Sequence, residues 1–337
     1  MKICIVGAGA IGGMLGVKLA LTGNDVTLIL RGANLEAVKA NGLTLIEENG
    51  NELVAKPIKA TSVIAEAGLQ DVIILALKAH QVSAVAADLP ALMHAGTRVV
   101  TMQNGIPWWY FHKIPGELSK PYLGKPVQAV DPDGNIAKHI PIDSVIGSVV
   151  YPASEVIRPG VIKVIEGNRF TLGEIDGSDT PSIRAISDAF KAAGFKAPVS
   201  NDIRSEIWLK VWGNLSFNPI SALTHATLED ICVFPATREL AANMMTEAQN
   251  IGAKLGVQFK VSLEKRIAGA QAVGQHKTSM LQDVEAGRQL ELQALVGAVI
   301  ELGQITDTPT PTIKAVYALT SLLAKNLADH KATLSIS

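Results

Sequence analysis

The spacing of hydrophobic and polar residues along the chain changes at about residue 200. Before about residue 200, short uninterrupted apolar runs alternate with stretches of helical periodicity. Such runs are typical of strands buried on both faces, and the alternation predicts repeated β–α units in a doubly wound parallel sheet. The predicted strands are residues 2–6, 25–30, 71–77 and 98–102, with a hairpin at 43–60 that turns at Asn49-Gly50.

From about residue 202 the pattern becomes helical throughout. The predicted helices are 203–218, 237–255, 260–275, 280–303 and 310–329. The fold class is therefore α/β. A Rossmann-type domain is expected over residues 1–201, and an all-helical domain over 202–337. A stretch rich in proline, glycine and aromatic residues, 107–143, interrupts the first domain and is interpreted as a long excursion, either a lid or an oligomer contact.

Composition narrows the class of protein. Hydrophobic residues make up 48% of the 337 residues, charged residues 18%, and the formal net charge is −1. Nothing in this balance favours nucleic acid or an anionic membrane surface as a partner. The two cysteines, Cys4 and Cys232, lie in apolar runs and are too few for a disulfide framework. The sequence predicts a soluble, cytoplasmic protein without a signal peptide, a membrane span or a metal site.

A glycine-rich turn follows the first predicted strand and opens a helix. Gly7, Gly9 and Gly12 have the G-x-G-x-x-G spacing of a dinucleotide-binding turn. The first glycine permits the tight turn, the second lets the backbone approach a pyrophosphate, and the third allows close packing of helix on strand. A chance glycine turn is the alternative, but the flanking strand and helix favour dinucleotide binding. The predicted contact residues are Gly7, Ala8, Gly9, Ala10, Ile11 and Gly12.

The end of the second strand indicates which dinucleotide is bound. An NAD site places a carboxylate there for the ribose hydroxyls, whereas this chain has Leu30-Arg31. A guanidinium group binds a 2′-phosphate well, so NADP is the predicted cofactor. A solvated arginine that ends a strand is the alternative.

Two further side chains follow predicted parallel strands. Lys78 and Asn104 come directly after such strands, in "LALKAH" and "TMQNG", where ligands of doubly wound sheets bind. The alternatives are an ordinary surface lysine and an Asn-Gly turn.

A polar stripe lies on the first helix of the second half. Lys210, Asn214 and Asn218 are spaced four residues apart in "WLKVWGNLSFNP" and fall within roughly an 80° arc of a helix otherwise made of core residues. Unpaired buried polar groups are costly, so a ligand is expected against this stripe. A structural Lys–Asn network is the alternative, and Asn218 before Pro219 also suits a helix end.

For two later positions, Ser279 and Glu291, the sequence pattern alone does not decide between a structural and a functional role. Ser279 stands three residues before Gln282, which is typical of a helix N-cap with a capping box. Glu291 falls at the edge of an apolar stripe, and periodicity does not distinguish it from Glu285 and Arg288.

Together these motifs resemble the ketopantoate reductase (2-dehydropantoate 2-reductase) family over essentially the whole chain. The segments that carry the resemblance are "GAGAIGG", "LILR", "LALKAH", "QNG", "NDIRSEIWLKVWGNLSFNP" and "TSMLQDVEAGRQLELQ". The resemblance implies a Rossmann domain followed by a helical domain of the kind that forms the C-terminal part of 6-phosphogluconate dehydrogenase, with the active site in the cleft between them. It implies NADPH-dependent reduction of a 2-oxo acid, ketopantoate in the family itself.

The resemblance also implies residue roles. Lys210 would be the general acid, Asn214 and Asn218 would hold the substrate, and Ser279 would bind its carboxylate. Asn104 would reach the substrate from the cofactor side. The implied cofactor contacts, besides the glycine turn, are Arg31, Lys78, Asn104, Ala153 and Glu291.

An independent chemical argument agrees with the role of Lys210. Hydride transfer to a ketone builds negative charge on oxygen, which an ammonium group stabilises and protonates. Burial on an apolar helix face is expected to lower the pKa of that ammonium group.

Departures from the family pattern leave the substrate open. His276 stands where members often carry an asparagine, and a further asparagine is not evident in "HATLED". The alternatives are therefore a reductase of another 2-oxo acid, or a non-catalytic NADP-binding redox sensor in which Lys210 is structural. The expected partner is a small 2-oxo acid, and a homodimer is possible.

Overall fold

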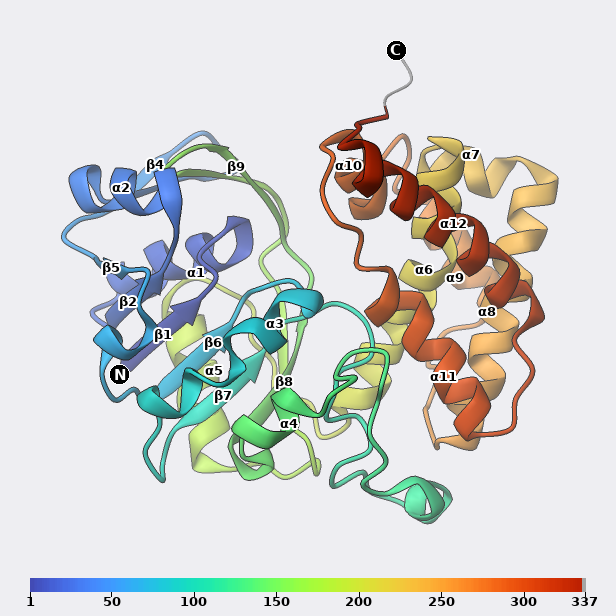
Figure 1. The fold of residues 1–337 in the computed structure, drawn as a ribbon, viewed down its shortest axis with the longest axis horizontal. Coiled ribbons are helices and arrows are strands. Elements are labelled where there is room, and N and C mark those ends of the chain that lie inside the picture. The colour runs from blue at the N-terminus through green and yellow to red at the C-terminus, as the bar shows by residue number, and fades with distance from the viewer. Residues whose placement is uncertain (335–337) are drawn as a thin grey trace. The chain divides into compact units, whose positions relative to one another are not determined.

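The main sheet of the protein has the parallel, doubly wound topology that the strand pattern predicts. The structure, a computed structural model, describes residues 1–334; residues 335–337, the end of the predicted second domain, lie outside it. Seven strands lie in the order β11-β8-β7-β6-β1-β2-β5. The strands from β8 to β5 are labelled in Figure 1. All neighbours pair in parallel except β11 and β8. The strands are β1 Lys2–Val6, β2 Asp25–Ile29, β5 Lys59–Thr61, β6 Val72–Leu75, β7 Arg98–Thr101, β8 Val145–Val150 and β11 Phe170–Glu174.

The predicted hairpin is present and belongs to a second sheet. β3 (Leu43–Ile46) and β4 (Glu52–Ala55) pair antiparallel, and β3 also pairs in parallel with β10 (Val161–Glu166), which is followed at the edge by β9 (Ala153–Arg158). The helices of this part of the chain are α1 Ala10–Leu21, α2 Gly32–Asn41, α3 Ala79–Ala86, α4 Asn135–His139 and α5 Pro181–Ala192, with short 3₁₀ turns η1 Ile64–Ala67, η2 Leu89–Leu92 and η4 Ile142–Ser144.

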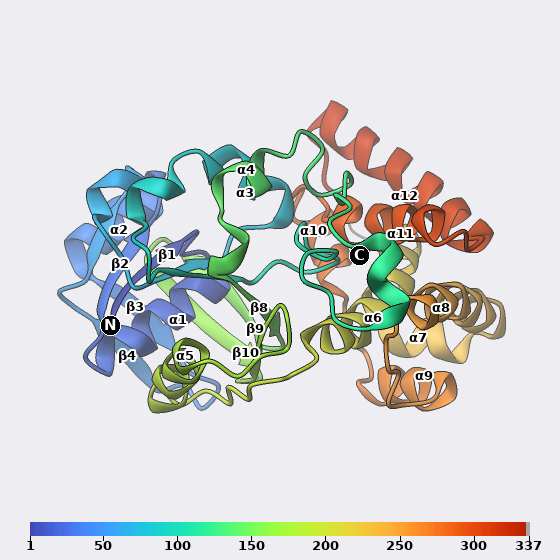
Figure 2. The same cartoon turned by 90° about the horizontal axis from the view of Figure 1, so that it is seen from below.

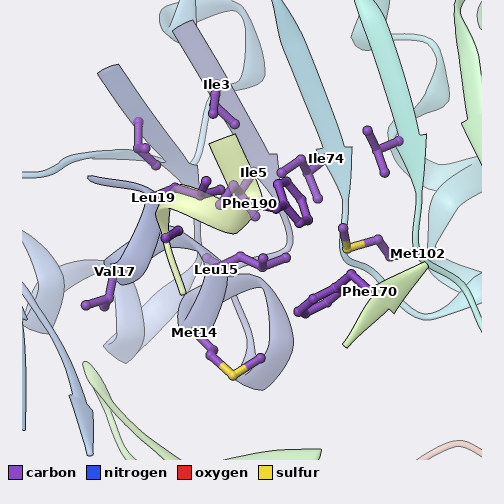
Figure 3. Close-up of a cluster of buried hydrophobic side chains, with 14 of the residues drawn as sticks. Ile3, Ile5, Met14, Leu15, Val17, Leu19, Ile74, Met102, Phe170 and Phe190 are labelled. Atoms are coloured by element: carbon purple, nitrogen blue, oxygen red, sulfur yellow. The ribbon is translucent and has the colours of Figure 1, made fainter. Parts of the chain in front are cut away.

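Helix α1 is the centre of this part of the protein, because it packs against strands of both sheets (Figure 2). Its apolar side chains meet the main sheet, where Leu15 lies in one buried cluster with Ile5, Ile74 and Phe170 (Figure 3). Its other side approaches the second sheet so closely that a Cβ at Gly13 would lie 1.9 Å from Ile162 Cδ1. Glycines along α1 therefore let one helix serve two sheets.

Residues 104–132 contain one 3₁₀ turn, η3 (Glu117–Tyr122), and the described chain from Ile203 onward is mostly helical. Its helices are α6 Ile203–Thr224, α7 Leu228–Val233, α8 Pro235–Lys254, α9 Leu263–Ala272, α10 Ser279–Glu285, α11 Ala298–Ile305 and α12 Pro311–His330, with a π-helical turn η5 (Gln293–Gly297) directly before α11. Helix α8 packs against α7, α9, α11 and α12. No helix among residues 1–334 is long and apolar enough to cross a membrane.

Two of the predicted helices differ from the structure by more than three residues at an end. The helix predicted over 203–218 continues through Pro219 to Thr224. The helix predicted over 280–303 is wrong as one element, since α10 ends at Glu285 and the chain turns at Gly287, whose φ is +62°. Helical structure resumes at Leu292. The apolar period survives this break, which is why the pattern suggested one long helix.

The chain divides into two compact units, and the division differs from the predicted one. The first unit holds Met1–Gln103 and Asp133–Ile203; the second holds Asn104–Pro132 and the chain from Arg204 onward. The change of character thus falls two residues beyond the predicted boundary. The predicted excursion, residues 107–143, is divided between the two units. Its residues up to Pro132 belong to the helical unit, and those from Asp133 onward belong to the first unit.

Buried aromatic and charged contacts explain why residues 104–132 join the helical unit. The guanidinium of Arg204, on the first turn of α6, donates to the carbonyls of Tyr110 at 2.8 Å and His112 at 2.6 Å. The indole of Trp208 donates to the Tyr110 hydroxyl at 2.7 Å. Further along, the Glu301 carboxylate accepts from the backbone N–H groups of Gln128 and Ala129, both at 2.7 Å.

Removal of the Tyr110 hydroxyl should weaken this unit. Tyr110→Phe leaves the buried Trp208 N–H without its acceptor, so we expect the free energy of unfolding to fall by about 1–3 kcal/mol. Urea denaturation followed by tryptophan fluorescence measures this loss. Tyr122→Phe is the control on the same segment, because Tyr122 is partly exposed, and it should change stability less. Equal stabilities of Tyr110→Phe and the wild type would contradict the proposed anchoring.

Candidate functional site

The glycine turn of the first unit has the shape that a bound pyrophosphate needs. β1 ends at Val6, Gly7 has φ +91°, and α1 begins at Ala10. A Cβ at Gly12 would lie 2.5 Å from the Gly7 carbonyl oxygen, so close packing requires glycine there. A Cβ at Gly9, by contrast, would meet no atom within 4 Å. The space over Gly9 lies at the N-terminus of α1, which has no side-chain cap and favours an anion.

Three neighbouring strands carry the predicted cofactor residues at their carboxyl ends. β6, β1 and β2 lie side by side in the sheet. The glycine turn follows β1, Arg31 lies two residues beyond β2, and Lys78 lies three residues beyond β6. Arg31 is exposed and directly precedes α2, and Lys78 directly precedes α3. The order of the strands also reverses between β1 and β6, and ligands of open parallel sheets bind at such a point.

The remaining residues of the turn support its shape. The backbone N–H groups of Gly7 and Ala8 both donate to the Ile29 carbonyl at 3.3 Å, which ties the turn to the end of β2. Ala10 and Ile11 form the first turn of α1. Ala153 lies elsewhere in the topology: it begins β9 of the second sheet and pairs with Glu166. Its predicted contact with the cofactor therefore stays a prediction.

The polar stripe of the second unit lies on α6 as one continuous helical face. Lys210 and Asn214 are partly buried, and Asn218 is only 5% exposed. Since α6 runs on to Thr224, Asn218 does not end the helix, and the alternative role for this residue is wrong. The side chains around the stripe are fully buried core residues: Trp208, Val211, Trp212 and Leu215.

Ser279 is not the N-cap that its spacing suggested. Thr278 takes that position, and its hydroxyl accepts from the Leu281 N–H at 3.3 Å. The Gln282 side chain donates to the Lys277 carbonyl instead of closing a capping box. Ser279 is exposed at the start of α10, and its hydroxyl accepts a long hydrogen bond, 3.4 Å, from the Asn218 amide. The serine is thereby held beside the stripe.

Glu291 lies directly before the helix that resumes at Leu292, and its carbonyl accepts from the Leu295 N–H at 3.2 Å. Its carboxylate accepts from the Asn104 amide at 3.4 Å. The chain next to Asn104 is bound to the same helix, because the Ile106 N–H donates to the Ala294 carbonyl at 2.9 Å. Asn104, predicted to reach the substrate from the cofactor side, thus belongs to the helical unit.

The ammonium group of Lys210 is tuned by two opposing effects. Burial lowers its pKa to about 8, and the negative charge of Glu291 works against that fall. Near neutral pH the group therefore carries a proton that it can give up at little cost, as a general acid must.

The structure thus assembles two sets of predicted residues. One is the glycine turn with Arg31 and Lys78 around the carboxyl ends of three strands. The other is Lys210, Asn214 and Asn218 with Ser279, Glu291 and Asn104 in the helical unit. His276 contributes its backbone, since its carbonyl accepts from the Leu228 N–H at 3.0 Å.

One pair near this site was missed. Asp283 and Arg288 form an ion pair at 2.8 Å just before Glu291. The signal in the sequence was a pair of opposite charges five residues apart in "QDVEAGR", spanning a glycine.

A dinucleotide-type turn on a parallel sheet, followed by a helical unit with a tuned lysine, defines a nicotinamide-dependent oxidoreductase of two units. Family models agree: residues 3–108 match "Ketopantoate reductase PanE/ApbA", and residues 202–324 match the C-terminal model of the same family. The chain belongs to the ketopantoate reductase family.

Individual relatives span the whole chain. A 2-dehydropantoate 2-reductase of Mesorhizobium japonicum is 54% identical over 96% of this chain and 98% of its own. A solved structure of a candidate ketopantoate reductase from Ralstonia solanacearum superposes with a TM-score of 0.90, at 41% identity, over 97% of this chain and 98% of its own. D-mandelate dehydrogenase, solved with NADH and anilino(oxo)acetate, shares the fold at 22% identity, with a TM-score of 0.80 over 97% of this chain and 100% of its own.

A methyl group at Gly9 should separate cofactor binding from folding. Gly9→Ala adds a Cβ that meets no protein atom, so stability should change little, whereas NADPH binding should weaken at least about tenfold because the methyl takes the space of the pyrophosphate. Calorimetric titration and thermal unfolding measure the two effects. Gly269→Ala, in a similarly open position on α9, is the control and should leave binding unchanged. Unaltered NADPH affinity in Gly9→Ala would argue against the site.

Proposed function

We propose that the protein reduces 2-dehydropantoate (ketopantoate) to pantoate with NADPH, a step that supplies a precursor of pantothenate. The observation that carries the proposal is Lys210: a partly buried ammonium group, with a pKa of about 8, in line with two amides on one helix face. The 54% identical relative that bears the name 2-dehydropantoate 2-reductase supports the choice of substrate.

Each residue of the helical unit has a task in this reaction. Lys210 donates its proton to the ketone oxygen as the carbon is reduced, so that the ketone, one hydride and one proton give the alcohol. Asn214 and Asn218 hold the polar groups of the substrate by their amides, and the Ser279 hydroxyl donates to the substrate carboxylate. The bound cofactor supplies the hydride.

Glu291 and Asn104 connect the acid with the cofactor. The Glu291 carboxylate keeps Lys210 protonated and contacts the cofactor, while the Asn104 amide contacts both cofactor and substrate. Among the residues of the first unit, the glycine turn receives the pyrophosphate, and Ala153 contributes a backbone contact.

NADP is favoured over NAD by the end of β2. Arg31 directly precedes α2 and is exposed, so its guanidinium is available to a 2′-phosphate. Lys78, which lies beyond the carboxyl end of β6, adds a second positive charge for the bound cofactor.

Steady-state turnover tests the proposal. NADPH oxidation is followed with ketopantoate and with other 2-oxo acids, among them 2-oxoisovalerate and benzoylformate. The highest kcat/KM with ketopantoate supports the proposal, and a clear preference for another acid would keep the chemistry but refute the substrate. Tight NADPH binding without turnover of any acid would favour a redox sensor.

The pH dependence of turnover should report Lys210. Reduction requires the protonated amine, so kcat/KM should be level below pH 8 and fall about tenfold per pH unit above the pKa of about 8. Pantoate oxidation requires the neutral amine and should rise over the same range.

Substitution of Lys210 tests whether its amine is the group that donates the proton. Lys210→Ala should lower kcat at least about a hundredfold and abolish the alkaline limb, whereas Lys314→Ala, at an exposed position on α12, should keep both. An unchanged pH profile in Lys210→Ala would show that another group donates the proton.

Arg31 should set the cofactor preference. Arg31→Ala is expected to weaken NADPH binding by about 1–3 kcal/mol, the worth of a hydrogen bond to a charged group, and to leave NADH binding almost unchanged. Fluorescence titration with both cofactors measures the difference. Equal affinity of the wild-type protein for NADPH and NADH would refute this role.

A further inference from the structure

The π-helical turn η5 changes the hydrogen bonding of one buried carbonyl. In an α-helix the Ala298 N–H would donate to the carbonyl of Ala294, four residues back. Here it donates to the carbonyl of Gln293, five residues back. The α-helical donor for Ala294 is therefore used by another residue. Because Ala294 is only 2% exposed, its carbonyl needs a donor from elsewhere in the protein.

That donor comes from the segment 104–132. The Ile106 N–H donates to the Ala294 carbonyl at 2.9 Å. Gly105, directly before it, lies against the same peptide group: a Cβ at Gly105 would stand 2.2 Å from the Ala294 oxygen and 2.9 Å from the Ala294 Cβ. Gly105 also has φ +94°, a conformation that favours glycine. Space and backbone conformation thus both require glycine at position 105.

Asn104 is the next residue along this segment. Its amide donates to the Glu291 carboxylate at 3.4 Å, which is the only hydrogen bond of that side chain among residues 1–334. A bond of this length holds an amide weakly. Gln103, on its other side, is bound within the first unit, where its side chain donates to two carbonyls. The position of the Asn104 amide beside Glu291 therefore depends on how residues 105 and 106 are held.

We propose that η5 is a docking site for the backbone of residues 105–106, which holds the Asn104 amide in place for cofactor and substrate. Gly105 and Ala294 are positioning residues that act through Asn104. The inference rests on the proposed function, because the proposed contacts of Asn104 give the docking its task. π-Helical turns are rare, and many of them lie at functional sites, which agrees with this role.

Gly105→Ala tests the proposal. The added Cβ collides with the Ala294 carbonyl, so the backbone at Ile106 must move away and carry Asn104 with it. We expect kcat/KM for the 2-oxo acid that is turned over best to fall at least about tenfold. We also expect hydrogen exchange at the Ile106 amide to become at least about tenfold faster. Deuterium exchange with residue-level fragmentation in a mass spectrometer measures the second effect.

Gly116→Ala is the matched control. Gly116 lies in the same segment with φ +96°, but a Cβ there would meet no atom within 4 Å. This variant has the same unfavourable backbone conformation without the collision, so kcat/KM and exchange at Ile106 should both stay unchanged. If Gly105→Ala fails to fold, Ala294→Val enlarges the other side of the contact and should produce the two effects expected of Gly105→Ala.

A double-mutant cycle shows whether Gly105 acts through Asn104. If it does, the two losses overlap, and Gly105→Ala should change kcat/KM by less than about twofold in a protein that already carries Asn104→Ala. Losses that simply multiply would show that Gly105 acts by another route, and they would overturn the proposal.

The exchange measurement separates this inference from the proposed function, because it needs no substrate. Slow exchange at Ile106 in the wild type and fast exchange in Gly105→Ala support the docking, whichever acid is reduced. Equal exchange in the two proteins overturns it, even if ketopantoate is turned over. Lack of turnover with ketopantoate would refute the proposed substrate alone.

Discussion

The arrangement of the helical unit depends on the burial of one positive charge, the ammonium group of Lys210. Lys210 stands on a helix whose other faces are filled by Trp208, Val211, Trp212 and Leu215. Desolvation alone would drive its amine towards the neutral form, and the Glu291 carboxylate limits that fall, leaving a pKa of about 8. An ammonium group whose pKa lies near the working pH suits an acid catalyst.

Several distant segments are needed to maintain this balance. Arg204 and Trp208 bind Tyr110 and so fix the segment 104–132 against the first turns of α6. That segment carries Asn104 to Glu291. The tuned lysine is thus a property of the whole helical unit. The glycine turn in the first unit is simpler, because its geometry follows from a few adjacent residues.

The sequence predicted best those features that depend on neighbours along the chain. The parallel strands, the hairpin at Asn49-Gly50 and the glycine spacing are local, and the structure has all of them. The polar stripe was also visible, because Lys210, Asn214 and Asn218 follow helical periodicity. Their roles, in contrast, came from the family resemblance, and they stay proposals.

Features decided by tertiary contacts were not predictable in the same way. Thr278 and Ser279 are both good caps, and Asn218, 61 residues away, is what meets Ser279. The break after Glu285 is hidden because the apolar period continues across it. The placement of residues 104–132 depends on Arg204, 94 residues from Tyr110, and no local pattern records that contact.

A crystal structure of the protein with NADP⁺ and pantoate would show whether the stripe on α6 receives the substrate, with Lys210 at the reacting oxygen. We expect the 2-hydroxyl of pantoate within hydrogen-bonding distance of Lys210 Nζ, and its carboxylate at the Ser279 hydroxyl. Pantoate bound away from α6, with no contact to Lys210, would rule this arrangement out.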